Sequence, residues 1–328
     1  MDILIRESGI GEIRMILETN LKKENDNDQN APIEKRHPVI RFIKRLVKEK
    51  PLGTFSLIII LVLVITAIFA NFLAPYGMNE TNPMIALSPP STTHLLGTDN
   101  LGRDLLSRVI YGARISITVG FAATLFSIII STLIGLISGF IGGWLDMIIQ
   151  RFVDAWMGFP GIILLIVLIS IIGPGLLQVI LVLGLAYGIT GSRIVRSAVI
   201  SIKENVYVEA ARAIGTPTWK LLMRHILPNV LSTIIVLFSV RVPAVIMTEA
   251  SLSFLGFGIP PPTASWGGML SGAGRQYMFM APWIAIWPGL ALALTVYSIN
   301  MFGDTVRDLL DPRLRGGVGR YGVEVKRQ

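Results

Sequence analysis

Cysteine is absent from the 328-residue chain, and charged side chains are scarce. Without cysteine there is no disulfide framework, no thiolate nucleophile and no cysteine-ligated zinc. Only 15% of the residues are charged, whereas soluble domains carry about a quarter, and 52% are hydrophobic. These proportions exclude a soluble enzyme and indicate a protein whose solvent is the lipid bilayer.

Motifs for catalysis and nucleotide binding are missing as well. None of the nine lysines follows a glycine, so the chain has no Walker A loop with which to bind ATP. His37, His94 and His225 lie too far apart in the sequence to favour a metal site. The net charge of +8 does not require nucleic acid, because membrane proteins gather Lys and Arg in cytoplasmic loops. We therefore expect no enzymatic activity, catalytic residue, metal, cofactor or nucleic-acid partner.

Long uncharged stretches predict an all-α polytopic membrane protein with six transmembrane helices, since about 20 apolar residues cross a bilayer. The stretch 155–192 would form one helix of about 57 Å, too long for a single crossing. Gly173-Pro174-Gly175 divides it into two spans joined by a tight turn. The six spans lie in the stretches 51–79, 115–145, 155–192 (two spans), 229–248 and 276–303.

The basic residues predict the orientation of these spans. With both termini in the cytoplasm, 24 of the 29 Lys and Arg residues lie on the cytoplasmic side, as is usual for membrane proteins. We therefore expect residues 1–50 to form a cytoplasmic extension, residues 51–305 the six-span domain and residues 306–328 a cytoplasmic tail.

Small residues recur every four positions in three of the spans. This spacing lets a second helix approach closely, either within the bundle or in a neighbouring subunit. The three stripes are Ala123, Ser127, Ser131, Gly135, Gly139 and Gly143 in the second span, Gly184, Gly188 and Ser192 in the fourth, and Ala285, Gly289 and Ala293 in the sixth.

The longest internal cytoplasmic loop, residues 207–228, has the pattern of two short helices. The first covers residues 208–214 and ends at Gly215, which suits a left-handed conformation. Thr216 caps a second helix that begins at Pro217, and Pro228 restarts the chain as the fifth span.

The second of these helices has an apolar face formed by Trp219, Leu222 and Met223, with Lys220 and Arg224 beside it. Such a helix can dock into the groove of a soluble partner. It can equally lie on the lipid surface. Periodicity alone leaves both possibilities open.

The 207–228 loop resembles the EAA loop of ABC importer permeases. The resemblance rests on Glu209-Ala210-Ala211, on Gly215 and on Leu227-Pro228. His225 departs from the general consensus, and the sequence His225-Ile-Leu-Pro-Asn229 is similar to the dipeptide and oligopeptide branch of the family. The residues to which the resemblance assigns coupling to the ATPase are Glu209, Ala210, Ala211, Gly215, Thr216, Trp219, Lys220, Arg224, Leu227 and Pro228. Within this set Glu209 would be a polar anchor, Gly215 the bend and 216–224 the coupling helix.

Three further segments resemble the second permease subunit of the same branch, so that the similarity covers roughly two thirds of the chain. They are Leu96 to Arg114, Glu249 to Gly267, and Gly303 to Arg315.

The resemblance implies a type I importer permease fold and a place in the bacterial cytoplasmic membrane. It further implies translocation of dipeptides or oligopeptides, driven by ATP that separate subunits hydrolyse. The implied partners are a second homologous permease, two ABC ATPases, an extracytoplasmic solute-binding protein and the lipid bilayer. Nickel, glutathione and opines are alternative solutes of the same machinery. A standalone ion-coupled carrier or channel is the alternative from another class, which the scarcity of buried carboxylates disfavours.

Charged and aromatic residues near the spans can serve a structural or a transport role. Arg241 lies inside the fifth span, and Glu249 near its outer end, so each either lines the translocation path or serves as a structural charge. The charged side chains of residues 99–114 are expected to be solvated on an amphipathic surface helix, and Trp266 to be an interfacial anchor.

Overall fold

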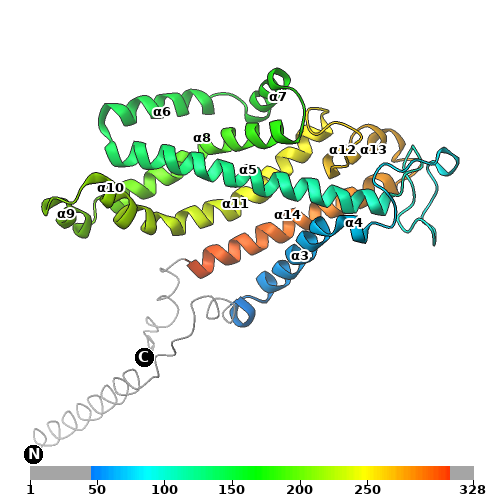
Figure 1. Cartoon of the computed structure of the whole chain (residues 1–328), viewed down its shortest axis with the longest axis horizontal. Helices are drawn as coiled ribbons and strands as arrows, with labels where there is room; N and C mark the ends of the chain where they lie inside the picture. The colour runs from blue at the N-terminus through cyan, green and yellow to red at the C-terminus, as the bar shows by residue number, and fades with distance from the viewer. Residues whose placement is uncertain (1–45, 311–328) are drawn as a thin grey trace, which may run out of the picture. The chain divides into compact units, whose positions relative to one another are not determined.

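The computed structural model describes residues 46–310. Within that range the chain is almost entirely helical (Figure 1), and its β pairing is limited to one isolated bridge between Thr98 and Asp104. The predicted N-terminal extension and C-terminal tail fall largely outside the described residues.

Five described helices are long and apolar enough to cross a membrane. They are α3 (Pro51–Ile68), α5 (Leu105–Ile141), α8 (Leu176–Lys203), α11 (Leu227–Phe254) and α14 (Trp283–Leu310). The shorter elements are α4 (Ala70–Leu73), the 3-10 helix η1 (Pro83–Ile85), α6 (Gly143–Met157), α7 (Gly161–Ile172), α9 (Val206–Ala213), α10 (Thr218–Lys220), the π-helix η2 (Leu221–Ile226), α12 (Trp266–Leu270) and α13 (Gly272–Tyr277).

The predicted third span, the first half of 155–192, contains all of α7 but only the last residues of α6, and these two helices form a bent pair. The described residues therefore contain five spans, or six if the pair counts as one. Helices α6 and α7 meet at an angle of 92°. Pro160 is the N-cap of α7 and has no N–H with which to continue a helix, which accounts for the break. The predicted turn after α7 is confirmed, with φ of 97° at Gly173 and 156° at Gly175.

Helices α5 and α8 pack tightly along the small-residue stripes of the second and fourth spans. A Cβ atom on Gly188 would lie 2.7 Å from the Cβ of Ile130, and one on Gly139 would lie 2.9 Å from the backbone oxygen of Arg196. The hydroxyl of Ser131 donates to the backbone oxygen of Gly188 across the same contact, at 2.9 Å. These two stripes therefore pack within the bundle.

The other predicted small residues behave differently. Gly143 belongs to α6 and is exposed. In the sixth span Ala293 is exposed, and a Cβ on Gly289 would meet only Leu270, at 3.9 Å.

The remaining long helices complete the bundle. Helix α14 lies beside α3 and α11 (Figure 1). Helices α9 and α10 lie at one end of the bundle, on the left in Figure 1, and α12, α13 and the segment 74–104 lie at the other. We refer to these ends as the α9 end and the α13 end.

The fit between α5 and α8 predicts that Gly188→Ala destabilises the protein. The added methyl overlaps Ile130 and cannot move away from the backbone, so we expect a loss of about 1–3 kcal/mol. Thermal unfolding of the purified protein in detergent measures this loss. Gly161→Ala is the control, because a Cβ there meets nothing within 4 Å. Equal melting temperatures for the two variants would contradict the tight packing.

Candidate functional site

The 207–228 loop is anchored to the bundle by a few buried apolar side chains. Val208 and Ala211 of α9 pack with Leu221 and Ile226 of η2 in the hydrophobic cluster that also contains Val199 of α8. Glu209 and Ala210 project from the opposite side of α9 and are exposed. The loop thus has one face fixed to the membrane helices and one free face.

Gly215 forms the predicted bend, with φ of +79°. Its N–H donates to the oxygen of Arg212, and the N–H of Thr216 donates to the oxygen of Ala211. These two bonds form a Schellman motif, which ends a helix with a residue in the left-handed conformation. A Cβ at this position would meet nothing within 4 Å, so that the backbone conformation, rather than crowding, favours glycine.

The predicted start of the second helix is wrong. Pro217, not Thr216, is the N-cap residue of α10, and no side chain caps it. The fifth span does begin at the predicted place, because α11 starts at Leu227 with Pro228 in its first turn. The chain is not broken there, however, since α10, η2 and α11 form one helical run of 37 residues, Thr218–Phe254.

The π-helix η2 explains how this run passes Pro228. The Leu227 N–H donates to the oxygen of Leu222, five residues earlier. Pro228 has no N–H to donate, and a locally wider helix tolerates its ring. The Asn229 side chain donates to the backbone oxygen of His225 at 2.6 Å, so this oxygen has a partner despite the altered winding.

The winding of η2 also changes which side chains are buried. Leu221 and Ile226 are buried and Leu222 is partly buried, but Trp219 is 65% exposed and Met223 is also exposed. Two of the three residues of the predicted apolar face, Trp219 and Met223, are therefore exposed within the described chain.

The free face of the loop combines large apolar side chains with charges. Exposed apolar side chains gathered in this way mark an interaction surface. Its apolar members are Val206, Tyr207, Ile214, Trp219 and Met223, and its charged members are Glu209, Arg212, Lys220 and Arg224.

Two carboxylates hold α6 against α8 near the α9 end. Asp146 accepts from Nε and Nη2 of Arg196 at 2.6 and 2.5 Å, and Asp154 pairs with Arg193. Sequence analysis missed these pairs. The signal was present, because Asp146 and Asp154 are the only acidic residues between positions 105 and 203.

The two charged residues of α11 lie in different surroundings. Glu249 is fully buried, and Ser253 donates to its Oε1 at 2.7 Å. Arg241 is only partly buried, and its guanidinium carbon lies 5.0 Å from the centre of the Tyr187 ring. The two charges do not pair with each other, because eight positions separate them by about 12 Å along the helix.

At the α13 end, the charged residues that precede α5 are buried rather than solvated, contrary to the prediction. Asp99 accepts from the backbone N–H groups of Leu101 and Arg103 and from Nε of Arg103, at 2.7 to 3.0 Å. Arg108 is buried beside the same carboxylate and donates to the backbone oxygen of Met78. Asp99 thereby organises the turn that leads into α5.

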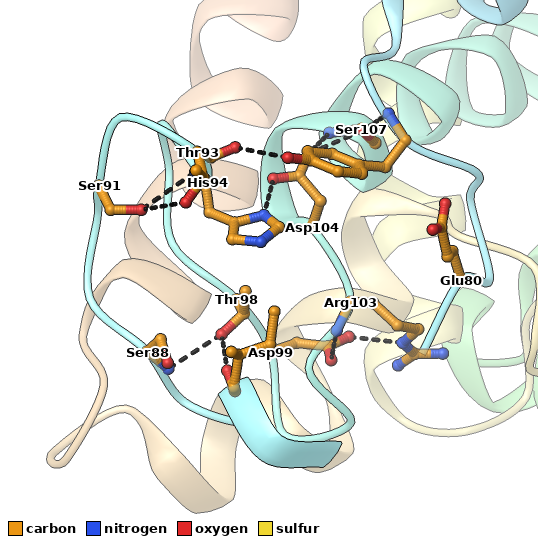
Figure 2. Close-up of polar contacts among 12 residues, drawn as sticks. Glu80, Ser88, Ser91, Thr93, His94, Thr98, Asp99, Arg103, Asp104 and Ser107 are labelled. Carbon is orange, nitrogen blue, oxygen red and sulfur yellow. Dashed lines mark hydrogen bonds and ion pairs between the residues drawn. The ribbon is translucent and has the colours of Figure 1, made fainter. Parts of the chain in front are cut away.

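Asp104 fastens the segment 74–104 to the first turn of α5 (Figure 2). One of its oxygens accepts from the N–H of Ser107 as an N-cap, at 2.8 Å, and the other lies 3.0 Å from Nδ1 of His94. The His94 ring in turn packs on Tyr76, with 4.8 Å between the ring centres.

Trp266 is also placed differently from the prediction. It is 1% exposed, and its Nε1 donates to the backbone oxygen of Val109. It therefore packs within the bundle, where it joins α12 to α5, and is not an interfacial anchor.

These contacts predict that Asp104→Ala loosens the segment 74–104. The variant loses both the cap of α5 and the partner of His94, and loss of a cap costs about 1–2 kcal/mol. We expect faster chymotrypsin cleavage at the exposed Leu95. Asp104→Asn keeps an oxygen that can cap the helix and should be cleaved more slowly than the alanine variant. Cleavage of the alanine variant at the wild-type rate would contradict this anchoring.

Comparison with known proteins assigns the fold and the loop to a family. The profile described as "binding-protein-dependent transport system inner membrane component" matches residues 131–316. A second profile, described as the N-terminal transmembrane domain of oligopeptide transport permease C, matches residues 40–90.

Similar proteins include a dipeptide transport system permease protein of Alkalihalophilus pseudofirmus, which is 41% identical over 83% of this chain and 89% of its own. A glutathione transport system permease protein of Pectobacterium atrosepticum is 40% identical over 85% of this chain and 93% of its own. Among solved structures, an inward-facing MetNI methionine ABC transporter superposes with a TM-score of 0.52 at 20% identity. The match covers 62% of this chain and 96% of the MetNI chain, and it shows that the two share a fold.

Proposed function

The chain belongs to the family of binding-protein-dependent transport system inner membrane components, and from this premise we infer that it is a permease subunit of an ATP-driven peptide importer. The family match carries this inference, and the two relatives named for dipeptide and glutathione transport support a peptide as the solute. The chain itself is a membrane protein and not an enzyme, so hydrolysis of ATP falls to a partner subunit.

We propose that the free face of the 207–228 loop docks on an ABC ATPase subunit. Trp219 and Ile214 expose 65% and 82% of their surface, and neither belongs to the hydrophobic clusters of the described residues. Interfaces are enriched in tryptophan anchors surrounded by polar groups, and Glu209, Lys220 and Arg224 supply such groups.

The continuous helix Thr218–Phe254 would carry the motion of the ATPase into the membrane. A helix of 37 residues is about 55 Å long, and a displacement at Trp219 would reach Arg241 along one continuous helical run. Val208 and Ala211 hold α9 against the start of this helix, so that α9 and the helix move together. In this proposal Gly215 is the bend that sets α9 and α10 at the required angle.

The complete importer in this proposal contains a second, homologous permease, two ATPases and an extracytoplasmic binding protein. The α9 end faces the cytoplasm, where the ATPases are, and the α13 end faces outward toward the binding protein. Both termini would then lie in the cytoplasm. This orientation is supported by the excess of Lys and Arg in the segments assigned to the cytoplasm.

Trp219→Ala tests the docking surface. Because the side chain is exposed, we expect the variant to fold normally but to bind the ATPase more weakly, by about 2 kcal/mol or thirtyfold if Trp219 is an interface hot spot. The measurements are peptide uptake in cells that carry the variant and co-purification of the ATPase subunits.

Phe279→Ala is the matched control, because Phe279 is 88% exposed at the α13 end. We expect it to retain the ATPase. Glu209→Lys is a second probe of the same surface and should reduce uptake without lowering the amount of permease in the membrane. If Trp219→Ala and Glu209→Lys both left uptake and ATPase binding intact, this loop would not be the coupling element.

The absence of cysteine allows a direct test of orientation, since any introduced thiol is the only one in the chain. Met84→Cys and Ile214→Cys place thiols on side chains that are 95% and 82% exposed at opposite ends of the bundle. In intact spheroplasts a membrane-impermeant maleimide should label the first and not the second. Permeabilised cells, in which both should be labelled, provide the control. The reverse pattern would invert the proposed topology.

A further inference from the structure

Arg241 differs from the arginines of α5 and α8 in having no hydrogen-bonding partner among residues 46–310. On α5 and α8, Arg108 and Arg114 donate to backbone oxygens, while Arg193 and Arg196 pair with aspartates. Within residues 46–310 Arg241 has only its contact with the Tyr187 ring. The five N–H donors of its guanidinium group are therefore left without an acceptor.

The position of Arg241 makes this lack of a partner costly. It lies near the middle of α11, a helix of 28 residues that crosses the membrane. A charge at this depth is unfavourable unless it faces a cavity or a partner, and such residues commonly mark a solute path. Something outside the described chain must supply the acceptor.

Tyr187 holds the arginine in place while leaving its donors free. The phenol oxygen of Tyr187 on α8 lies 2.6 Å from Oγ1 of Thr248, which is on the same helix as Arg241. The ring is thereby fixed over α11 and stacks against the guanidinium group. Stacking on an aromatic face stabilises the cation without using its N–H groups.

A cavity adjoins this arrangement. Its volume is about 350 Å³, within the range of small-molecule sites. Tyr187, Thr190, Thr248 and Ser251 line it with hydroxyl groups from α8 and α11, and side chains of α6 and α7 form an apolar wall. Tyr187 lines this cavity and its ring also contacts Arg241, so this one side chain links the arginine to the cavity.

We propose that Arg241 binds the free carboxylate of the peptide during translocation, with Tyr187 as the positioning residue. The planar guanidinium group can donate two parallel hydrogen bonds to a carboxylate, and every unmodified peptide ends in one. The apolar wall of the cavity accepts side chains of different kinds. The positive charge of Arg241 disfavours a free divalent metal ion as the solute. This inference rests on the proposed peptide-import function.

Glu249 is excluded from this role by its burial. It is 0% exposed and accepts a hydrogen bond from Ser253, so it has no access to a passing solute. Of the two charges on α11, the structure assigns only Arg241 to the path.

The test uses the complete importer in cells, with two probes: alanyl-alanine and its C-terminal amide, each well below the concentration that half-saturates uptake by the wild type. Arg241→Gln should lower uptake of the free peptide about tenfold or more, the value of a charged hydrogen bond, and change uptake of the amide less than twofold. The same binding protein serves every variant, so its own preference cancels in the comparison.

Two further variants keep the test decisive. Arg241→Lys retains the charge and should restore at least a third of the uptake of the free peptide. Ser239 lies on the same helix as Arg241, and its hydroxyl bonds only to the backbone oxygen of Val236. The Ser239→Ala variant should therefore transport both probes as the wild type does. The amount of permease in the membrane and its co-purification with the second permease are measured for each variant.

Several outcomes would overturn the inference. If Arg241→Gln lowered uptake of the free peptide and of the amide equally, Arg241 would be a structural residue. If the amide proves too poor a substrate, equal uptake of the free peptide by the Gln and Lys variants would lead to the same conclusion. Loss of the second permease from the complex would show that Arg241 pairs with that subunit instead. If the wild type transports neither probe, the proposed peptide solute is itself wrong, and the role of Arg241 is withdrawn with it.

Discussion

The close approach of α5 and α8 is the contact on which the rest of the bundle depends. Glycine and serine at the seam allow backbone atoms of the two helices to come within contact distance, where even one methyl group would overlap. In a membrane, lipid removes most of the hydrophobic drive for helices to associate, so this fit has to supply the attraction. Once α5 and α8 are joined, α6 is held by the Asp146–Arg196 and Asp154–Arg193 pairs.

The helical run Thr218–Phe254 connects the two regions to which we assign function. Its first turns carry the exposed Trp219, its middle carries Arg241, and its last turns carry the buried Glu249. The π-helix at residues 221–226 lets the run pass Pro228 without a break. A proline that would ordinarily end a helix is thus accommodated within a continuous connection between the proposed ATPase surface and the proposed solute path.

The segment at the α13 end shows why charge patterns in a membrane protein are hard to interpret. Residues 99–108 alternate in charge like a solvated helix, yet Asp99, Asp104 and Arg108 are buried. Asp99 and Asp104 accept hydrogen bonds from backbone N–H groups of the turn and the first helical turn that follow them. Arg108 donates to a backbone oxygen 30 residues earlier in the chain. Periodicity describes one helix at a time and carries no information about such partners.

Composition and spacing alone determined the class of the protein, the presence of most spans, the turn at Gly173–Gly175 and the bend at Gly215, because these depend on local chemistry and helix length. The motifs of the 207–228 loop further indicated the family. Tertiary structure alone decided that Pro228 does not interrupt the helical run Thr218–Phe254 and that Trp266 is buried. It also separated Arg241 from Glu249, since the environment of a charge depends on which neighbouring helix covers it. Tyr187, which lies 54 positions before Arg241 in the chain, covers the arginine only because α8 and α11 pack side by side.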